Sequence, residues 1–210
     1  MKLAKLIFVS ESHRRILTIA APVVLSNATI PLLGLVDTGV VGQLGDAAAI
    51  GAVGVGAITL SAVYWVFAFL RQGTSGLAAQ AIGAGDRAED SALLTRVIIV
   101  AAIGGLALIA AQAPIFWAAF RLAPVSAEVE MLAREYMGIR LWSAPAAIAI
   151  YGISGWLIAR ERTTALFVQQ LWTNGLNIVL SISFVLGLGW GISGVALATL
   201  VAEWTGCALG

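Results

Sequence analysis

The sequence predicts an all-α membrane protein, a bundle of six transmembrane helices. Of its 210 residues, 60% are hydrophobic and only 11% are charged, whereas soluble domains carry about 25% charged residues. The mean hydropathy is +0.96. Long, mostly apolar runs recur along the chain, and a helix of about 20 such residues crosses the roughly 30 Å of hydrocarbon in a bilayer.

The first three predicted spans are separated by short polar breaks. The first, 15–43, is almost free of charge and begins at the end of an arginine pair. The second, 47–80, follows the break QLGD and is long enough to be tilted or to protrude. The third, 91–119, follows GAGDRAED. Both breaks hold the glycine and charged residues that are expected of turns.

The other three predicted spans are delimited in the same way. They are 129–159 after RLAPVSAE, 164–187 after ARERT, and 191–210 after GLGWG. No linker is long enough to separate domains, so we expect one membrane domain, 15–210, after a cytoplasmic lead-in at 1–14. The sixth span runs to the last residue without a flanking charge, which predicts that the chain is one half of something larger.

Lysine and arginine are biased toward one side of the predicted bundle, and such a bias sets membrane orientation. With the N-terminus inside, the outer loops hold Arg121, and also Arg134 and Arg140 if the fourth helix extends past the membrane. The inner segments hold more, namely Lys2, Lys5, Arg14, Arg15, Arg87, Arg96, Arg160 and Arg162. We therefore predict a multi-pass protein of a bacterial-type inner membrane with a cytoplasmic N-terminus.

The stretch 20–45 of the first span and the break after it carries a carboxylate, Asp37, and no basic residue. An ionised acid in hydrocarbon costs roughly 3 kcal/mol on insertion scales, so such residues usually face a bundle interior or a wet cavity. Burial disfavours the charged form, which makes Asp37 a candidate proton carrier. Pro22 and Pro31 favour kinks and are candidate hinges. Protonation of Asp37 would then bias a bend between two states.

The fifth span carries polar side chains at intervals of 4, 3 and 4 residues, Gln170, Asn174, Asn177 and Ser181. This spacing places them on one face of a helix. Lipid offers no hydrogen-bond partners, so the stripe either bonds to neighbouring helices or forms the wall of a wet cavity. We favour the cavity wall, with Gln170 as a substrate residue and the other three in ion coupling.

Several further residues are unusual for a membrane helix. Arg71 lies well inside the second apolar region, where it either snorkels to an interface or pairs with Asp37 or with substrate. Trp156 is a candidate for lining a pocket for flat aromatic ligands, with an interfacial position as the alternative. Asn27 is a further candidate cavity residue. Glu203 is a second possible intramembrane acid, although we expect an interfacial position for it.

The sequence contains no motif of enzyme chemistry. There is no P-loop, no GxSxG and no HExxH, and a single cysteine, Cys207, cannot form an internal disulfide. A net charge of +1 gives no indication of a nucleic-acid partner. We predict a protein that is not an enzyme and has no metal or cofactor, and whose energy comes from a proton or sodium gradient or from a partner.

Three segments resemble the MATE (multidrug and toxic compound extrusion) transporters, most closely the DinF-type branch. They are APVVLSNATIPLLGLVDTGVVGQLG in the first span, FLRQGTSGLAAQAIGAGD at 69–86, and NGLNIVL with GLGWGISGVALAT within 174–199. The resemblance implies twelve helices in two six-helix lobes, with export driven by a proton or sodium gradient. This chain is similar to the N-terminal lobe alone.

The resemblance also implies roles for individual residues. Pro22 corresponds to a first-helix proline that is associated with bending. The implied ion-coupling network consists of Asp37, Tyr136, Asn177 and Thr199. Ser181 stands where the family often has a second aspartate, a difference that disfavours a two-carboxylate sodium site and favours proton coupling through Asp37.

The predicted function is therefore half of a secondary active multidrug exporter. It would exchange protons, or sodium, for organic cations or amphipathic drugs, through a cavity between this lobe and a missing C-terminal lobe. Its partners would be membrane lipid, that lobe and the substrate. One alternative is a flippase for lipids or lipid-linked precursors with the same superfold, which we expect to have a more basic cavity. The other alternative is a structural lobe that transports nothing.

Overall fold

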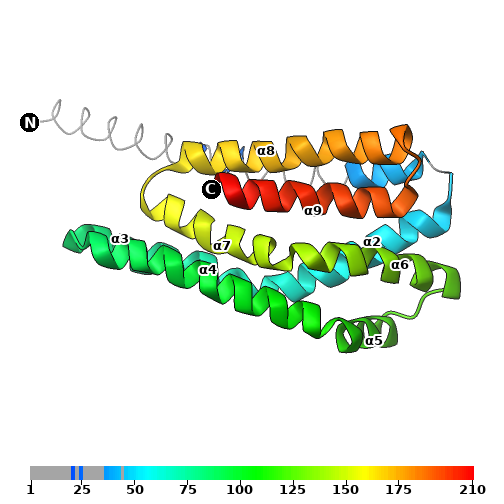
Figure 1. Ribbon diagram of the computed structural model, residues 1–210, viewed down its shortest axis with the longest axis horizontal. Helices are drawn as coiled ribbons and strands as arrows, with labels where there is room; N and C mark the ends of the chain where they lie inside the picture. The colour runs from blue at the N-terminus through cyan, green and yellow to red at the C-terminus, as the bar shows by residue number, and fades with distance from the viewer. Residues whose placement is uncertain (1–19, 22–23, 26–35, 44) are drawn as a thin grey trace, which may run out of the picture.

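The computed structural model describes residues 20–21, 24–25, 36–43 and 45–210, and this part of the chain is helical almost throughout (Figure 1). A helical segment covers 36–42. The elements that follow are α2 (Ala47–Trp65), η1 (Val66–Ala68), α3 (Phe69–Ala84), α4 (Arg87–Ala110), α5 (Gln112–Leu122), α6 (Ala127–Arg140), η2 (Leu141–Ser143), α7 (Ala144–Ala159), α8 (Thr163–Ile182), the π-helical η3 (Ser183–Gly187) and α9 (Gly191–Leu209).

Four helical stretches of the described chain are long and apolar enough to cross a membrane. Two of them join shorter helices through one turn of 3-10 helix: α2 continues through η1 into α3, and α6 continues through η2 into α7. The other two are α4 and α9. The 20 residues of α8 instead carry a row of buried polar side chains. The described residues thus form an all-helical membrane bundle, as the sequence predicts.

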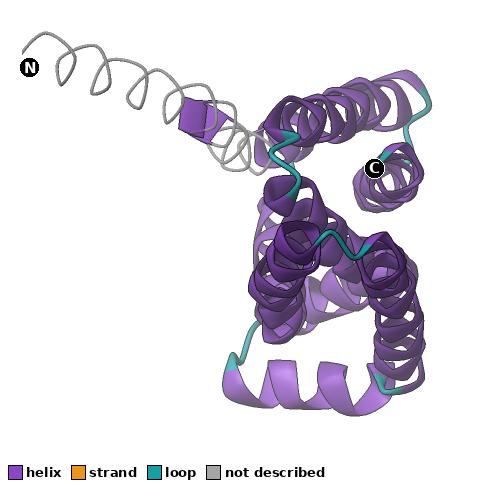
Figure 2. Cartoon of the chain, turned by 90° about the vertical axis from the view of Figure 1, so that its left-hand side faces the viewer, coloured by secondary structure: helices purple, strands orange, loops and turns teal. Residues whose placement is uncertain are grey.

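The predicted third span, 91–119, is two helices in the structure. α4 ends at Ala110 and α5 begins at Gln112, and α5 lies across the bundle while the longer helices run along it (Figures 1 and 2). The reason is Pro114, which has no amide hydrogen for the carbonyl of Ala110 and whose ring would clash with that carbonyl. Proline fits well in the first turn of a helix, and there it lies in α5.

α7 is the central helix of one part of the bundle, where it packs against α3, α4 and α9. Small residues allow this close packing. A β-carbon at Gly155 would lie 2.2 Å from the carbonyl oxygen of Arg71, and one at Gly105 would lie 2.4 Å from the amide nitrogen of Pro145. Packing, rather than the hydrophobic effect, drives helix association in lipid, so these two glycines hold α7 to its neighbours.

The remaining helices pack in pairs. α2 packs against α6, α6 against α9, and α8 mainly against α9. α8 and α9 lie side by side in both views, apart from the layer of α3 and α4 (Figures 1 and 2). Several buried polar residues meet at the junction between the α8–α9 pair and the rest of the bundle.

Gly155→Ala should destabilise the bundle by about 1–3 kcal/mol, because the added methyl group meets backbone that cannot rotate away. The measurement is thermal unfolding in detergent. Gly76→Ala on α3 is the matched control, since a β-carbon there has no atom within 4 Å. Equal unfolding temperatures for the two variants would contradict this account of α7 packing.

Candidate functional site

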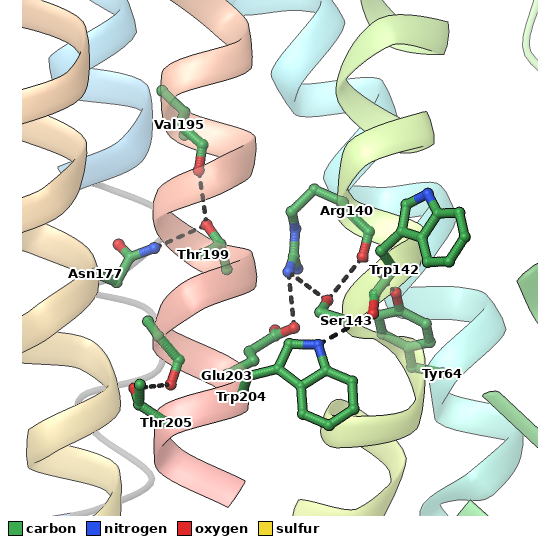
Figure 3. Close-up of polar contacts among 11 residues, drawn as sticks. Tyr64, Arg140, Trp142, Ser143, Asn177, Val195, Thr199, Glu203, Trp204 and Thr205 are labelled. Atoms are coloured by element: carbon green, nitrogen blue, oxygen red, sulfur yellow. Dashed lines mark hydrogen bonds and ion pairs between the residues drawn. The ribbon is translucent and has the colours of Figure 1, made fainter. Parts of the chain in front are cut away.

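The polar stripe of α8 faces the interior of the bundle. Asn174, Asn177 and Ser181 are all buried, and their spacing places them on one side of the helix. Asn177 Nδ2 donates a hydrogen bond of 2.7 Å to Thr199 Oγ1 on α9. The same hydroxyl donates to the carbonyl of Val195 at 3.0 Å (Figure 3). This chain of bonds fixes the asparagine with its amide nitrogen toward α9.

Asp37 lies in the helical segment 36–42 and is only 7% exposed. Ser181 Oγ donates a hydrogen bond of 3.2 Å to its Oδ1. Arg140 and Glu203 lie within electrostatic range of the same carboxylate. The structure thus buries Asp37 in the interior of the bundle and gives it a hydroxyl partner.

A largely buried ion pair joins α6 to α9. Arg140 Nη1 lies 2.9 Å from Glu203 Oε2, and the two side chains are 11% and 17% exposed. The same Nη1 donates to Ser143 Oγ at 3.2 Å, and the Tyr64 hydroxyl donates to the Arg140 carbonyl at 3.3 Å (Figure 3). The contacts with Glu203 and Ser143 hold the guanidinium between the two helices, and the contact with Tyr64 holds the backbone at Arg140.

The sequence analysis did not identify this ion pair. It assigned Arg140 to the outer side if the fourth helix extends past the membrane, and expected Glu203 at an interface; the structure shows that the two side chains are largely buried and pair with each other. The sequence did contain a signal for such a pair, because Arg140 and Glu203 carry opposite charges and both lie within predicted spans. Charged residues inside a membrane usually pair with one another. The sequence gave no indication that these two would be partners.

A cavity of about 280 Å³ lies between the ion pair and the polar face of α8. Its apolar side includes Ala147 and Ile150. Its polar side includes residues of five helices, namely Tyr64, Arg140, Tyr151, Gln169, Gln170, Thr173, Asn174, Asn177, Thr199 and Glu203. The cavity therefore has the mixed lining of a site for a polar or amphipathic ligand.

Three buried side-chain atoms of the described residues have no hydrogen-bond partner, and all three belong to residues that line this cavity. They are Arg140 Nε, Gln169 Oε1 and Asn177 Oδ1. A buried polar atom without a partner costs about 1–3 kcal/mol, so such atoms in one place indicate that something polar enters the cavity. The set offers one donor and two acceptors.

The structure brings some of the predicted site residues together at this cavity. Asn174, Asn177 and Thr199 line it, as does Gln170, whose Nε2 donates to Asn174 Oδ1 at 3.1 Å. Asp37 and Ser181 are not part of the lining and contact each other. Tyr136 is buried in the core, where its ring would contact a β-carbon at Gly56. Pro22, Asn27 and Pro31 fall outside the described residues.

Two predicted cavity residues lie elsewhere. Trp156 Nε1 donates to Asp90 Oδ1 at 2.9 Å, and the guanidinium of Arg160 lies 4.5 Å from the centroid of the indole ring. Asp90 also pairs with Arg160 at 2.9 Å, so the indole helps to satisfy a buried acid. Arg71 does not line the cavity either, and its carbonyl packs against Gly155.

Comparisons with known proteins agree with this architecture. A family model described as MatE matches residues 22–183. DNA damage-inducible protein F of Escherichia coli (strain K12) is 35% identical over 210 residues, which are 100% of this chain and 46% of that protein. "Probable multidrug resistance protein NorM" of Thermotoga maritima is 27% identical over 96% of this chain and 44% of its own length.

Solved structures give the same result. The crystal structure of MATE in the bent conformation matches with a TM-score of 0.85 and 25% identity, over 94% of this chain and 44% of that one. The chain thus spans less than half the length of the relatives that it matches. The resemblance and the fold class inferred from the sequence are confirmed.

Thr199→Val should lower stability by about 1–2 kcal/mol, because it removes the acceptor of the buried Asn177 amide while keeping the shape of the side chain. Thr199→Ser, which retains the hydroxyl, should lose less. Thermal unfolding in detergent measures both. A valine variant that unfolds at the wild-type temperature would show that the bond between α8 and α9 contributes nothing.

Proposed function

The chain belongs to the MatE family, and on that premise we propose that it forms one lobe of a secondary active multidrug exporter in a bacterial-type inner membrane. The lobe exchanges protons for organic cations or amphipathic drugs, and its N-terminus is cytoplasmic. Its partners are membrane lipid, the substrate and a second six-helix lobe. The substrate passes through a cavity between the two lobes. A multidrug role is in keeping with the name of the Thermotoga maritima relative.

The observation that carries this proposal is the sheltered carboxylate beside a polar cavity. Asp37 is buried, and Ser181 is its hydrogen-bond partner. A hydroxyl can donate to a carboxylate and can also accept from a carboxylic acid, so this contact suits both protonation states. A group that binds and releases a proton without losing its partner is suited to cycle between two conformations.

The proton is the better candidate for the coupling ion. Ser181, the partner of Asp37, is a hydroxyl at the position where relatives often carry a second aspartate, so this pair holds one negative charge. The cavity adds no net charge, because the charged residues in its lining are Arg140 and Glu203, which pair with each other. This balance also gives no support to the flippase alternative, for which we expect a basic cavity.

The test is proton-driven efflux of a fluorescent organic cation from liposomes. Residues 1–210 are joined to the part of the Escherichia coli relative that this chain does not cover, and a pH gradient is imposed. We expect efflux by this two-lobe protein and a loss of at least about tenfold in Asp37→Asn, because the amide cannot carry a proton. The 210-residue chain alone should show no efflux.

Asp46→Asn is the matched control. It makes the same chemical change at an exposed acid that caps α2, where asparagine caps equally well, so efflux should be unchanged. Full efflux by Asp37→Asn would exclude Asp37 as the coupling residue. Efflux by the single lobe would exclude the two-lobe proposal, and movement of a fluorescent phospholipid in place of the dye would favour the flippase.

A further inference from the structure

The short helix α5 runs across the bundle, and its neighbours in the chain place it near a membrane surface. In Figure 2, which looks along the long helices, α5 lies along one margin of the bundle. The helix before it, α4, has 24 residues and a length of about 36 Å, which is enough to cross the roughly 30 Å of hydrocarbon. The acids Glu89 and Asp90 occupy the first turn of α4 and mark one membrane surface, so α5 begins near the other.

The helix that follows, α6, gives an independent marker of depth. Its first part carries the cation Arg134 and the acids Glu128, Glu130 and Glu135. Charged side chains are costly in hydrocarbon, so this part of α6 lies at or beyond the membrane surface. The Arg134 guanidinium lies 4.8 Å from the centroid of the Phe120 ring, which belongs to α5. α5 therefore lies at the level of these charged residues, at the boundary between the hydrocarbon and the headgroups.

The two sides of α5 differ in exposure. Phe116 and Phe120 are buried in the main hydrophobic core, which fixes the inner side of the helix. The outer side carries Trp117, which is 66% exposed, and Arg121, which is exposed one turn later on the same face. Arg121 has no ion pair or hydrogen bond with any residue that the structure describes. An indole at a membrane surface prefers the headgroup level, and a guanidinium without a partner is complementary to a phosphate.

We propose that α5 is an interfacial anchor that binds a phospholipid. The indole of Trp117 lies between the headgroups and the acyl chains, and the guanidinium of Arg121 contacts the lipid phosphate. Leu122, at the end of α5, is 85% exposed, and a second large apolar side chain on this helix favours a lipid neighbour over water. Because α5 connects α4 to α6, a lipid held there fixes the depth of both helices in the bilayer.

The experiment measures the depth of α5 in liposomes. Cys207→Ser removes the single cysteine of the chain, and Trp117→Cys is then labelled with the fluorophore NBD. Quenching is compared between lipids that carry a nitroxide on the headgroup and lipids that carry it near the end of the acyl chain. We expect at least about twofold stronger quenching from the headgroup, because an interfacial helix buries its apolar side only about 5–10 Å deep. Since Trp117 is largely exposed, its replacement should not disturb folding.

Two labelled positions on neighbouring helices are the matched controls. Ile99→Cys is at an exposed position about 16 Å along α4 from its end, so the chain-end nitroxide should quench it best. Glu128→Cys, at an exposed position in the first turn of α6, should be quenched weakly by both lipids. A label at Trp117 that behaves like the one at Ile99 would place α5 in hydrocarbon, and one that behaves like Glu128 would place it in water. Either result overturns the proposal.

The phosphate contact is tested with Arg121 variants of the labelled Trp117→Cys chain. Headgroup quenching should fall by about half in Arg121→Gln and be retained in Arg121→Lys, which keeps the charge. Equal quenching in the glutamine variant would overturn the contact. The same label in the two-lobe protein described above shows whether the second lobe covers α5 instead, since quenching would then be lost, and that loss would also overturn the proposal. None of these measurements depends on transport.

Discussion

The need to pair every polar group inside a membrane bundle determines how this lobe is built. Hydrocarbon offers no hydrogen bonds, so a charge on one helix must find its partner on another. The pair of Arg140 and Glu203 is the clearest case, because it joins α6 to α9 with both side chains largely buried. The bond between Asn177 and Thr199 similarly joins α8 to α9. α9 therefore has a polar contact with α6 through Glu203 and another with α8 through Thr199.

The cavity follows from the difference in packing on the two sides of α7. Toward α3 and α4, Gly155 and Gly105 allow near contact of the backbones, so no space remains. Toward α8, the interface is polar, and polar side chains that bond to α9 or to their own helix leave a gap that apolar packing would close. The same stripe that makes α8 less apolar than its neighbours therefore creates the space beside it.

Much of this was predictable from the sequence, and the failures have physical causes. Intervals of 4, 3 and 4 residues define one face of a helix whatever its neighbours, so the stripe from Gln170 to Ser181 was found. Hydropathy alone could not show that Pro114 divides the third apolar run, because both sides of the break are apolar. The contact of Trp156 with Asp90 was not foreseen, because nothing in the sequence shows which indole will contact a buried acid.

The ion pair shows the limit of reading a membrane sequence by charge alone. Arg140 and Glu203 are 63 residues apart, so no local sequence pattern links them. Their opposite charges cancel, so the polar lining of the cavity carries no net charge. Asp37 has a serine hydroxyl, and not a cation, as its hydrogen-bond partner. A lobe with one acid free to titrate and a second acid neutralised by arginine differs chemically from one with two free acids, even where the helices superpose. Which charges are neutralised in such a lobe is therefore a property of pairs across helices, which the fold alone does not determine.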